Sequence, residues 1–302
     1  MEQAVPSEDA CCPDSSCCSP TPAPVSLGGV QTPRDDVRDS VREHYAKLIA
    51  QRSAAASCCS SPAPITEQAG YRDADLSALP DGLREASFGC GAPIQLAELE
   101  RGETVLDIGS GAGLDAILAA RRVGPTGRVI GLDMTPEMIE QARANLRHAG
   151  VTNAEIRQGY MEAMPLDDAA VDCVVSNCVI NLSPDKPAVF REVFRVLRPG
   201  GRMMVSDIVT HGLPPELRKD GFLYNSCVAG ALEQEDYLAA IRAAGFVDLR
   251  IVSKRTYDAD SIGELLQACC SGEPADRQRA LPDAAALAGR VSSVYVAANK
   301  PR

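Results

Sequence analysis

The sequence predicts an α/β fold in which helices cover both faces of a seven-stranded, mostly parallel sheet. Three observations support this prediction. The 302 residues leave room for one large domain and a smaller appended unit. Short apolar runs alternate with amphipathic stretches from residue 104 to residue 208, and a glycine-rich turn joins the first run to its helix. Such alternation indicates a parallel sheet, because each helix crosses back over the sheet to the next strand.

The elements before this region are mostly helical or irregular. Residues 1–35 mix Pro, Ser, Asp and Cys without a regular period, so we expect a flexible tail. An amphipathic helix is predicted over residues 35–51, and a tight turn over residues 87–93 precedes a short helix over residues 94–99. The apolar residues of the long helix recur at helical spacing: Val37, Val41, Tyr45, Leu48 and Ile49.

The alternating region supplies most of the sheet. The strands that we expect are residues 104–108, 128–133, 154–158, 171–180 and 202–208. The helices between them are expected over residues 113–122, 136–149 and 184–197. Two further strands, near residues 247–256 and 291–297, complete a seven-stranded sheet.

Composition and charge exclude some classes of partner. The formal net charge is −11 at pH 7, whereas affinity for nucleic acid or an anionic membrane surface depends mainly on Lys and Arg. Residues 1–10 carry acids and no apolar run, and no later segment approaches the roughly 18 apolar residues of a membrane span. We therefore expect no nucleic-acid or membrane partner and a cytoplasmic protein, whose 12 cysteines are mostly thiols.

The glycine-rich turn after the first strand indicates a ligand site. Gly109, Gly111 and Gly113 allow the backbone to turn sharply and to approach a ligand next to a helix N-terminus. A dinucleotide fingerprint requires a third glycine where this chain has Leu114, which disfavours NAD. Asp107 suits a cofactor that bears a cationic amino-acid group. A purely structural turn is the alternative.

Asp133 is the second feature of this site. It closes the second strand, 20 residues beyond Gly113, where a carboxylate can accept hydrogen bonds from both ribose hydroxyls. A cap or first-turn acid of the next helix is the alternative, although Thr135 can cap that helix without help. Together the turn and Asp133 predict a nucleoside cofactor.

These residues resemble the class I S-adenosylmethionine methyltransferases, and residues 193–202 are similar to the helix-to-strand turn of their small-molecule branch. The resemblance implies a Rossmann-like domain that binds S-adenosylmethionine. It also implies that an acid after the third strand, Glu162 here, lies near the adenine; a solvated loop acid is the alternative. The cofactor-binding residues that we expect are Asp107, Gly109, Ser110, Gly111, Gly113, Asp133, Met134, Met161, Glu162 and Asn177.

Three cysteines fall in segments that should border the cofactor cleft. They are Cys90 in the tight turn, Cys178 at the end of the fourth strand, and Cys227. Ligands of open parallel sheets bind beyond the carboxyl ends of the strands, so position favours Cys178 most. Each cysteine could instead be a small buried hydrophobe, and for Cys173, inside the strand, we prefer that interpretation.

The segments around these cysteines resemble the signatures of arsenite methyltransferases. The similar segments are residues 87–91, 176–182 and 227–231, in this order. The resemblance implies that Cys178 and Cys227 bind trivalent arsenic as thiolates, with Cys90 as the third ligand. Soft thiolate ligands suit a thiophilic centre of this kind.

The same resemblance implies the reaction. The arsenic lone pair attacks the sulfonium methyl carbon and S-adenosylhomocysteine leaves, so no base is required, and alignment by the protein is worth about 7–11 kcal/mol. The family also uses an upstream cysteine as a redox partner of the third ligand. That position falls on Cys58 or Cys59, with Cys59 slightly favoured. A thiol reductant, thioredoxin or glutathione, is then a co-substrate.

Six other cysteines are less determined by the sequence. They either capture metalloid or are exposed thiols with little role, and a structural zinc site is disfavoured because no partner pair lies at zinc-finger distance. These cysteines are Cys11, Cys12, Cys17, Cys18, Cys269 and Cys270.

Two other functions stay open at this point. A methyltransferase for a quinone- or sterol-type substrate would explain the glycine turn but not the cysteines, and a non-catalytic metalloid-binding protein would explain the cysteines but not the complete cofactor motif. We expect a monomer that acts on arsenite or its thiol conjugates. The expected organisation is a Cys-containing tail (1–35), a helical segment with the glycine turn (36–100), the cofactor domain (101–210), and an arsenic-binding C-terminal cap with the last strands (211–302).

Overall fold

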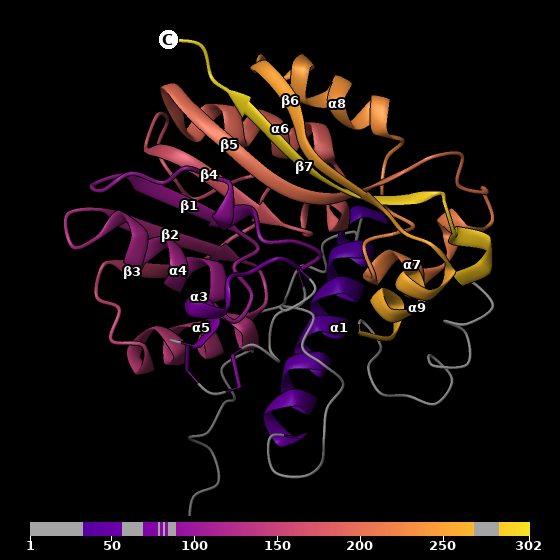
Figure 1. Ribbon diagram of the computed structural model, residues 1–302, viewed down its shortest axis with the longest axis horizontal. Helices are drawn as coiled ribbons and strands as arrows, with labels where there is room; N and C mark the ends of the chain where they lie inside the picture. Colours follow the sequence, from indigo (N-terminus) through magenta and orange to yellow (C-terminus); the bar gives the residue numbers. More distant parts are fainter. Residues whose placement is uncertain (1–32, 56–68, 78, 81, 84–88, 269–283) are drawn as a thin grey trace, which may run out of the picture.

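The computed structural model describes residues 33–55, 69–77, 79–80, 82–83, 89–268 and 284–302. In these residues seven strands form one twisted sheet in the order β3-β2-β1-β4-β5-β7-β6 (Figure 1). Only β7 runs antiparallel to its neighbours. The strands are β1 (Thr104–Ile108), β2 (Arg128–Asp133), β3 (Ala154–Gln158), β4 (Val171–Asn177), β5 (Leu197–Thr210), β6 (Val247–Thr256) and β7 (Val291–Asn299). The predicted fold class is confirmed.

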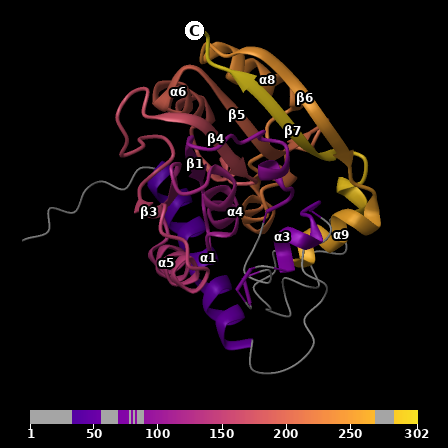
Figure 2. The same ribbon diagram turned by 60° about the vertical axis from the view of Figure 1, so that its left-hand side comes forward.

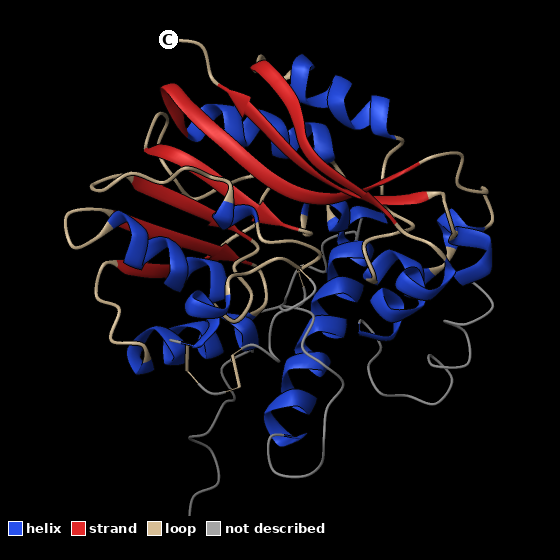
Figure 3. Cartoon of the chain, viewed as in Figure 1, coloured by secondary structure: helices blue, strands red, loops and turns tan. Residues whose placement is uncertain are grey.

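Helices lie on both faces of the sheet (Figure 3). On one face α4 (Leu114–Val123) and α5 (Pro136–His148) pack over inward residues such as Val105 and Val175. On the other face α6 (Lys186–Val196) and α8 (Gln234–Ala243) pack over Leu106 and Val174. Neighbouring residues of a strand point to opposite faces, so a strand buried on both sides must be apolar throughout.

A third apolar cluster lies outside these two layers and contains the three cysteines of interest. It combines Val41 of α1 (Pro33–Ala55) with residues of α7 (Gly221–Asn225) and α9 (Ala259–Ala268). Figure 2 shows α1 beside α5, with which it is in contact. None of the described helices combines the length and the apolar character that crossing a membrane requires.

The structure differs from the sequence-based expectation at the ends of several strands and helices. The fourth strand stops at Asn177 instead of residue 180, because Cys178 adopts a left-handed φ of 63° and the 3-10 helix η2 (Ile180–Leu182) follows. The fifth strand begins at Leu197, directly after α6. The expected helix over residues 94–99 is a single 3-10 turn, η1 (Pro93–Gln95). Three short elements complete the described chain: α3 (Asp73–Ser77), η3 (Leu217–Lys219) and the helix α7.

Candidate active site

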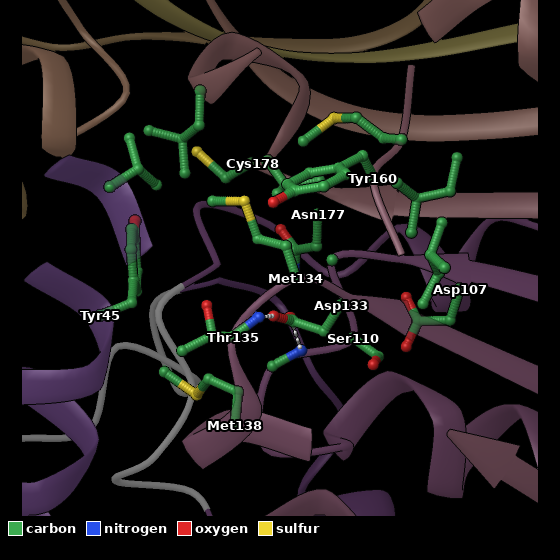
Figure 4. Close-up of a pocket in the computed structure, with 18 of the residues that line it drawn as sticks. Tyr45, Asp107, Ser110, Asp133, Met134, Thr135, Met138, Tyr160, Asn177 and Cys178 are labelled. Carbon is green, nitrogen blue, oxygen red and sulfur yellow. Dashed lines mark hydrogen bonds between the residues drawn. The ribbon is translucent and has the colours of Figure 1, made fainter. Parts of the chain in front are cut away.

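A cleft opens at the carboxyl ends of β1, β2 and β4, where the strand order reverses between β1 and β4. It encloses about 1030 Å³ of empty space, including the part open to solvent. Of the residues expected to bind the cofactor, all but Gly113 line it (Figure 4). The lining residues from that set are Asp107, Gly109, Ser110, Gly111, Asp133, Met134, Met161, Glu162 and Asn177.

The glycines give the turn after β1 its shape. Gly109, Gly111 and Gly113 have φ values of 66°, 51° and 91°, in the left-handed region that glycine adopts without steric cost. The amide of Gly109 donates to the carbonyl of Leu132 at 2.7 Å. Gly113 caps α4, and a Cβ there would lie 3.2 Å from that of Ala142 on α5. Gly113 therefore serves the packing of the two helices and lies outside the cleft lining.

Asp133 fastens this turn to the start of α5. Its carboxylate oxygens accept hydrogen bonds from the backbone amides of Gly111 and Thr135, both at 2.9 Å (Figure 4). Burial raises the pKa of the carboxyl, while these amides favour its charged form. The N-cap position of α5 belongs to Thr135, whose side chain makes no capping bond. Asp133 is thus held rigidly at the cleft where a ribose is expected.

Two more carboxyl groups give the inner part of the cleft an acidic character. Asp107 is 2% exposed, and its Oδ2, like the hydroxyl of Ser110, has no hydrogen-bond partner in the described structure. Burial, then the charges of Asp115 and Asp133, raises the pKa of Asp107. Burial also raises the pKa of Asp115, to about 6. An unpartnered buried acceptor costs free energy, which a cationic ligand in the cleft would offset.

The rim of the cleft is formed by α1 and the segment after β3. Glu162 accepts a hydrogen bond from the Ser183 hydroxyl at 2.6 Å and pairs with Arg38 of α1 at 3.3 Å. The Arg38 guanidinium also lies 4.9 Å from the centre of the Tyr160 ring. The Glu162 side chain is 8% exposed, so its interpretation as a solvated loop acid is wrong. Its contact with adenine stays a prediction.

Asn177 connects the cleft to the turn that carries Cys90. Its side-chain amide donates to the Gly91 carbonyl at 2.6 Å and to the Tyr71 hydroxyl at 3.0 Å, and its oxygen accepts from the Gly91 amide at 3.1 Å. The Tyr71 hydroxyl lies 2.9 Å from both carboxylate oxygens of Asp115. Asn177 therefore lines the cleft while its polar atoms hold the Cys90 turn against β4 and α4.

Cys90, Cys178 and Cys227 come from distant parts of the sequence and meet in one buried cluster. They are 9%, 7% and 4% exposed, and the Cys227 thiol donates to the Cys178 carbonyl at 2.8 Å. Hydrogen bonds with the thiols of Cys227 and Cys90, and then burial, raise the pKa of Cys178. Cys178 and Cys227 both have a left-handed φ, 63° and 62°. Such strain in a non-glycine residue concentrates at functional sites.

The other cysteines are separate from this cluster or outside the described residues. Cys173 is fully buried inside β4, and burial raises its pKa to about 12, which agrees with a structural role. Cys58, Cys59 and the pairs at 11–12, 17–18 and 269–270 lie outside the described residues. Within the described part of the chain, no three His, Cys, Asp or Glu side chains are arranged to hold a metal ion. The three thiols are therefore close but not a preassembled metal cage.

Sequence reasoning missed three residues of this site. Asp115 stands in the first turn of α4, and its place two residues after Gly113 was the available signal. Tyr71 and Arg38 reach the cleft through contacts across 44 and 124 positions of the chain, to Asp115 and to Glu162. No local pattern identifies partners at such separations.

Comparison with known proteins gives a consistent result. Residues 99–245 match a family model described as a methyltransferase domain. The chain is 41% identical over 254 residues to the arsenite methyltransferase of Halobacterium salinarum, over 77% of this chain and 65% of that one. It is 38% identical over 226 residues to that of Aquipseudomonas alcaligenes, over 72% and 64%. The chain thus spans slightly less than two thirds of these curated relatives.

A solved structure also resembles most of the chain. It is that of an arsenic(III) S-adenosylmethionine methyltransferase from Chlamydomonas reinhardtii, with 34% sequence identity and a TM-score of 0.61. The match covers 80% of this chain and 75% of that one.

Proposed function

This chain belongs to the arsenic(III) S-adenosylmethionine methyltransferase family, and on that premise we propose that it transfers a methyl group from S-adenosylmethionine to thiol-bound trivalent arsenic, converting arsenite to methylated arsenicals. One observation carries the proposal. Cys178 lines the cleft that fits the cofactor and also packs with Cys90 and Cys227 in one buried cluster, where the Cys227 thiol donates to the Cys178 carbonyl at 2.8 Å. Arsenic on these thiols would therefore border the cleft, where the methyl group is expected.

The cleft fits the cofactor in charge and in polar groups. Bound S-adenosylmethionine supplies an electrophilic methyl group on a positively charged sulfur. The unpartnered Oδ2 of Asp107 suits its ammonium group, and Asp133 suits its ribose hydroxyls. Met161 and Glu162 line the part of the cleft proposed for the adenine.

The buried thiols suit the proposed substrate. Arsenite is neutral As(OH)₃ near pH 7, and three thiols displace its three hydroxyl groups as water, so three As–S bonds form without net release of protons. The raised pKa of Cys178 therefore does not oppose arsenic binding, because each neutral thiol gives its proton to the hydroxyl group that leaves as water. Three sulfur ligands leave the arsenic lone pair free for the methyl group. The contribution of the protein is proximity and alignment, worth about 7–11 kcal/mol in favourable cases.

The reaction also requires a reductant. Transfer of a methyl cation to the arsenic lone pair raises the formal oxidation state of arsenic from +3 to +5, so two electrons must return before the next transfer. We propose that the thiols of Cys90 and of Cys58 or Cys59 give up these two electrons and two protons and form a disulfide as arsenic returns to +3; thioredoxin or glutathione then reduces this disulfide back to two thiols. A reducing compartment such as the cytoplasm would keep the thiols available, and we expect the enzyme to act as a monomer.

The first experiment measures the products. The purified protein is incubated with arsenite, S-adenosylmethionine and a thiol reductant, and arsenic species are separated by chromatography and quantified by elemental detection. We expect methylarsenicals that increase with time and are absent without the cofactor. If the cofactor binds and arsenite stays unmethylated, an organic substrate of the quinone or sterol type replaces arsenite as the leading function; arsenite binding without cofactor binding would leave a metalloid-binding protein.

Cys178→Ser tests the role of the cluster. We expect it to abolish methylation and to leave the dissociation constant of S-adenosylmethionine nearly unchanged, because the sulfur lies at the end of the cleft that meets the cluster. Cys173→Ser is the matched control, a buried cysteine inside β4, the strand that Cys178 follows, and outside the cluster. Normal turnover by Cys178→Ser would remove this residue from the mechanism.

A further inference from the structure

A second, smaller cavity reaches the thiol cluster, and none of the described residues that line it also lines the cofactor cleft. It contains about 360 Å³ of empty space, including its solvent-open part. Its walls come from the end of β6, the segment after it and α9, together with one residue before α3. The described residues that line it are Ala69, Cys90, Arg255, Tyr257, Ser261, Glu264 and Leu265.

The two cavities meet the cluster at different cysteines. Cys178 lines the cofactor cleft, Cys90 lines the second cavity, and Cys227 lines neither. All three cysteines belong to one buried cluster, in which the Cys227 thiol donates to the Cys178 carbonyl at 2.8 Å. An arsenic atom that enters through the second cavity would therefore meet Cys90 first and could pass to Cys178 without entering the cofactor cleft.

The charges that line the two cavities differ. Among the described residues that line the cofactor cleft, Arg38 is the sole basic one and it pairs with Glu162. The remaining acids, Asp107, Asp115 and Asp133, favour a cation and disfavour an anion. At the second cavity the exposed guanidinium of Arg255 lies 5.3 Å from the centre of the Tyr257 ring, which holds it beside the opening. Glu264 is the opposing charge at the same opening.

The Cys90 sulfur has hydroxyl groups around it that suit thiol exchange. The Ser293 hydroxyl lies 4.0 Å from the sulfur and donates to the Cys90 carbonyl at 3.4 Å, and the Ser206 hydroxyl lies 3.8 Å from the sulfur. Hydroxyl donors stabilise the negative charge that a thiol sulfur carries when it attacks.

We propose that the second cavity is the access site for trivalent arsenic carried by a small anionic thiol, with Arg255 contacting a carboxylate of the carrier and Cys90 as the first thiol to take the arsenic. The inference rests on the proposed function and specifies its substrate form. In the exchange, an As–S bond to Cys90 forms, one As–S bond to the carrier breaks, and the Cys90 proton ends on the released carrier thiol. Arsenic stays trivalent, so no oxidant or reductant is needed.

The test compares an anionic with a neutral carrier. Full-length protein is mixed with the arsenic(III) complex of glutathione or of 2-mercaptoethanol, without S-adenosylmethionine, and protein-bound arsenic is quantified after rapid gel filtration. For the glutathione complex we expect Arg255→Gln to slow uptake about fivefold, the usual upper range for one exposed charge contact, and Glu264→Gln to accelerate it. For the mercaptoethanol complex both variants should match the wild type. Arg250→Gln, an exposed arginine of β6 outside the cavity, is the control.

The opposite signs distinguish electrostatic guidance from damage to the fold. Slower uptake of both complexes by Arg255→Gln, or unchanged uptake of both, overturns the proposal. Both carriers are compared on the same variant, so arsenic uptake by the other cysteines enters both measurements. The proposed function is tested separately, by methylation of arsenite. If the wild type methylates arsenite and Arg255→Gln affects uptake from both carriers equally, only the access site is rejected.

Discussion

Asp115 carries a buried carboxyl group beside the proposed binding site of a cation. Its pKa of about 6 results first from burial, and the hydrogen bonds from Tyr71 and Asn177 oppose that increase. A bound cation favours the charged carboxylate, so the affinity for S-adenosylmethionine should rise with pH through about 6. Below that value affinity should fall by up to about tenfold per pH unit, as linkage of one proton requires.

Calorimetric titration with S-adenosylmethionine between pH 5 and pH 8 measures this dependence. Asp115→Asn should flatten it, because the amide does not titrate. The same slope in wild type and variant would assign the titration to another group, with Asp107 the next candidate since its pKa is also raised by burial.

Asp133 has both a structural and a proposed binding role. Asp133→Ala removes the acceptor of the Gly111 and Thr135 amides as well as the carboxylate expected to bind ribose. Hydrogen bonds to charged groups contribute about 1.5–3 kcal/mol, so we expect the dissociation constant of S-adenosylmethionine to increase about 10- to 100-fold. Calorimetry measures this dissociation constant, and the control variant is Asp168→Ala, which removes an exposed acid. An unchanged constant would argue against the ribose role.

At the scale of elements, the turn that carries Cys90 depends on close approach of its backbone to the sheet. A Cβ on Gly91 would overlap the Ser206 hydroxyl of β5 and lie 2.7 Å from the Tyr295 hydroxyl of β7. Gly91→Ala should therefore displace the turn and its cysteine, and methylation of arsenic should fall at least about tenfold, in proportion to the alignment that is lost. Single-turnover methylation with saturating cofactor measures this.

The control for Gly91→Ala is the affinity for S-adenosylmethionine, since Gly91 is not part of the cleft lining. Gly221→Ala provides a matched substitution, because a Cβ at Gly221 would meet no atom within 4 Å. Retention of full methylation by Gly91→Ala would show that the turn tolerates displacement and that Cys90 is not held in one place.

The strands and helices show which parts of the fold the sequence patterns predict. The strands β1, β2 and β3 have the predicted bounds because an apolar run between turn residues is a local signal. The end of β4 was missed, since a left-handed Cys178 has no sequence signature. The helices α7, α8 and α9 were not predicted either; α7 has five residues, and its Phe222 and Leu223 are buried by tertiary contacts that only the fold supplies.

In the site, too, some residues were predictable from local sequence patterns and others depend on the fold. The acids and glycines near β1 and β2 were predictable because motif spacing along the chain places them at one sheet edge. The partners of these residues were not: Tyr71 and Arg38 come from N-terminal segments, and their contacts depend on how those segments pack. The meeting of Cys90, Cys178 and Cys227 likewise depends on the whole fold; the sequence alone implied it only through family resemblance.

In the whole molecule, the three thiols belong to segments separated by 88 and 49 positions, and the third apolar cluster brings them together with residues of α7 and α9. Arsenic bound by all three would link the Cys90 turn, the end of β4 and the segment after α7. Because the ligand binds this arrangement only in the folded chain, it should stabilise the fold by about 2.7 kcal/mol at a free concentration 100 times its dissociation constant. The melting temperature should therefore rise, by roughly 2–4 °C per kcal/mol for a chain of this size.

Thermal unfolding with and without arsenite, followed by circular dichroism under reducing conditions, measures this increase. Cys227→Ser should lose most of this increase, because the two remaining thiols bind the arsenic without linking the segment after α7. Cys173→Ala is the control: it deletes a buried sulfur from β4 and lowers the starting melting temperature, but should keep the arsenic-induced increase. Equal increases in wild type and Cys227→Ser would mean that arsenic binds at other cysteines and that the buried cluster does not unite the two halves of the molecule around its substrate.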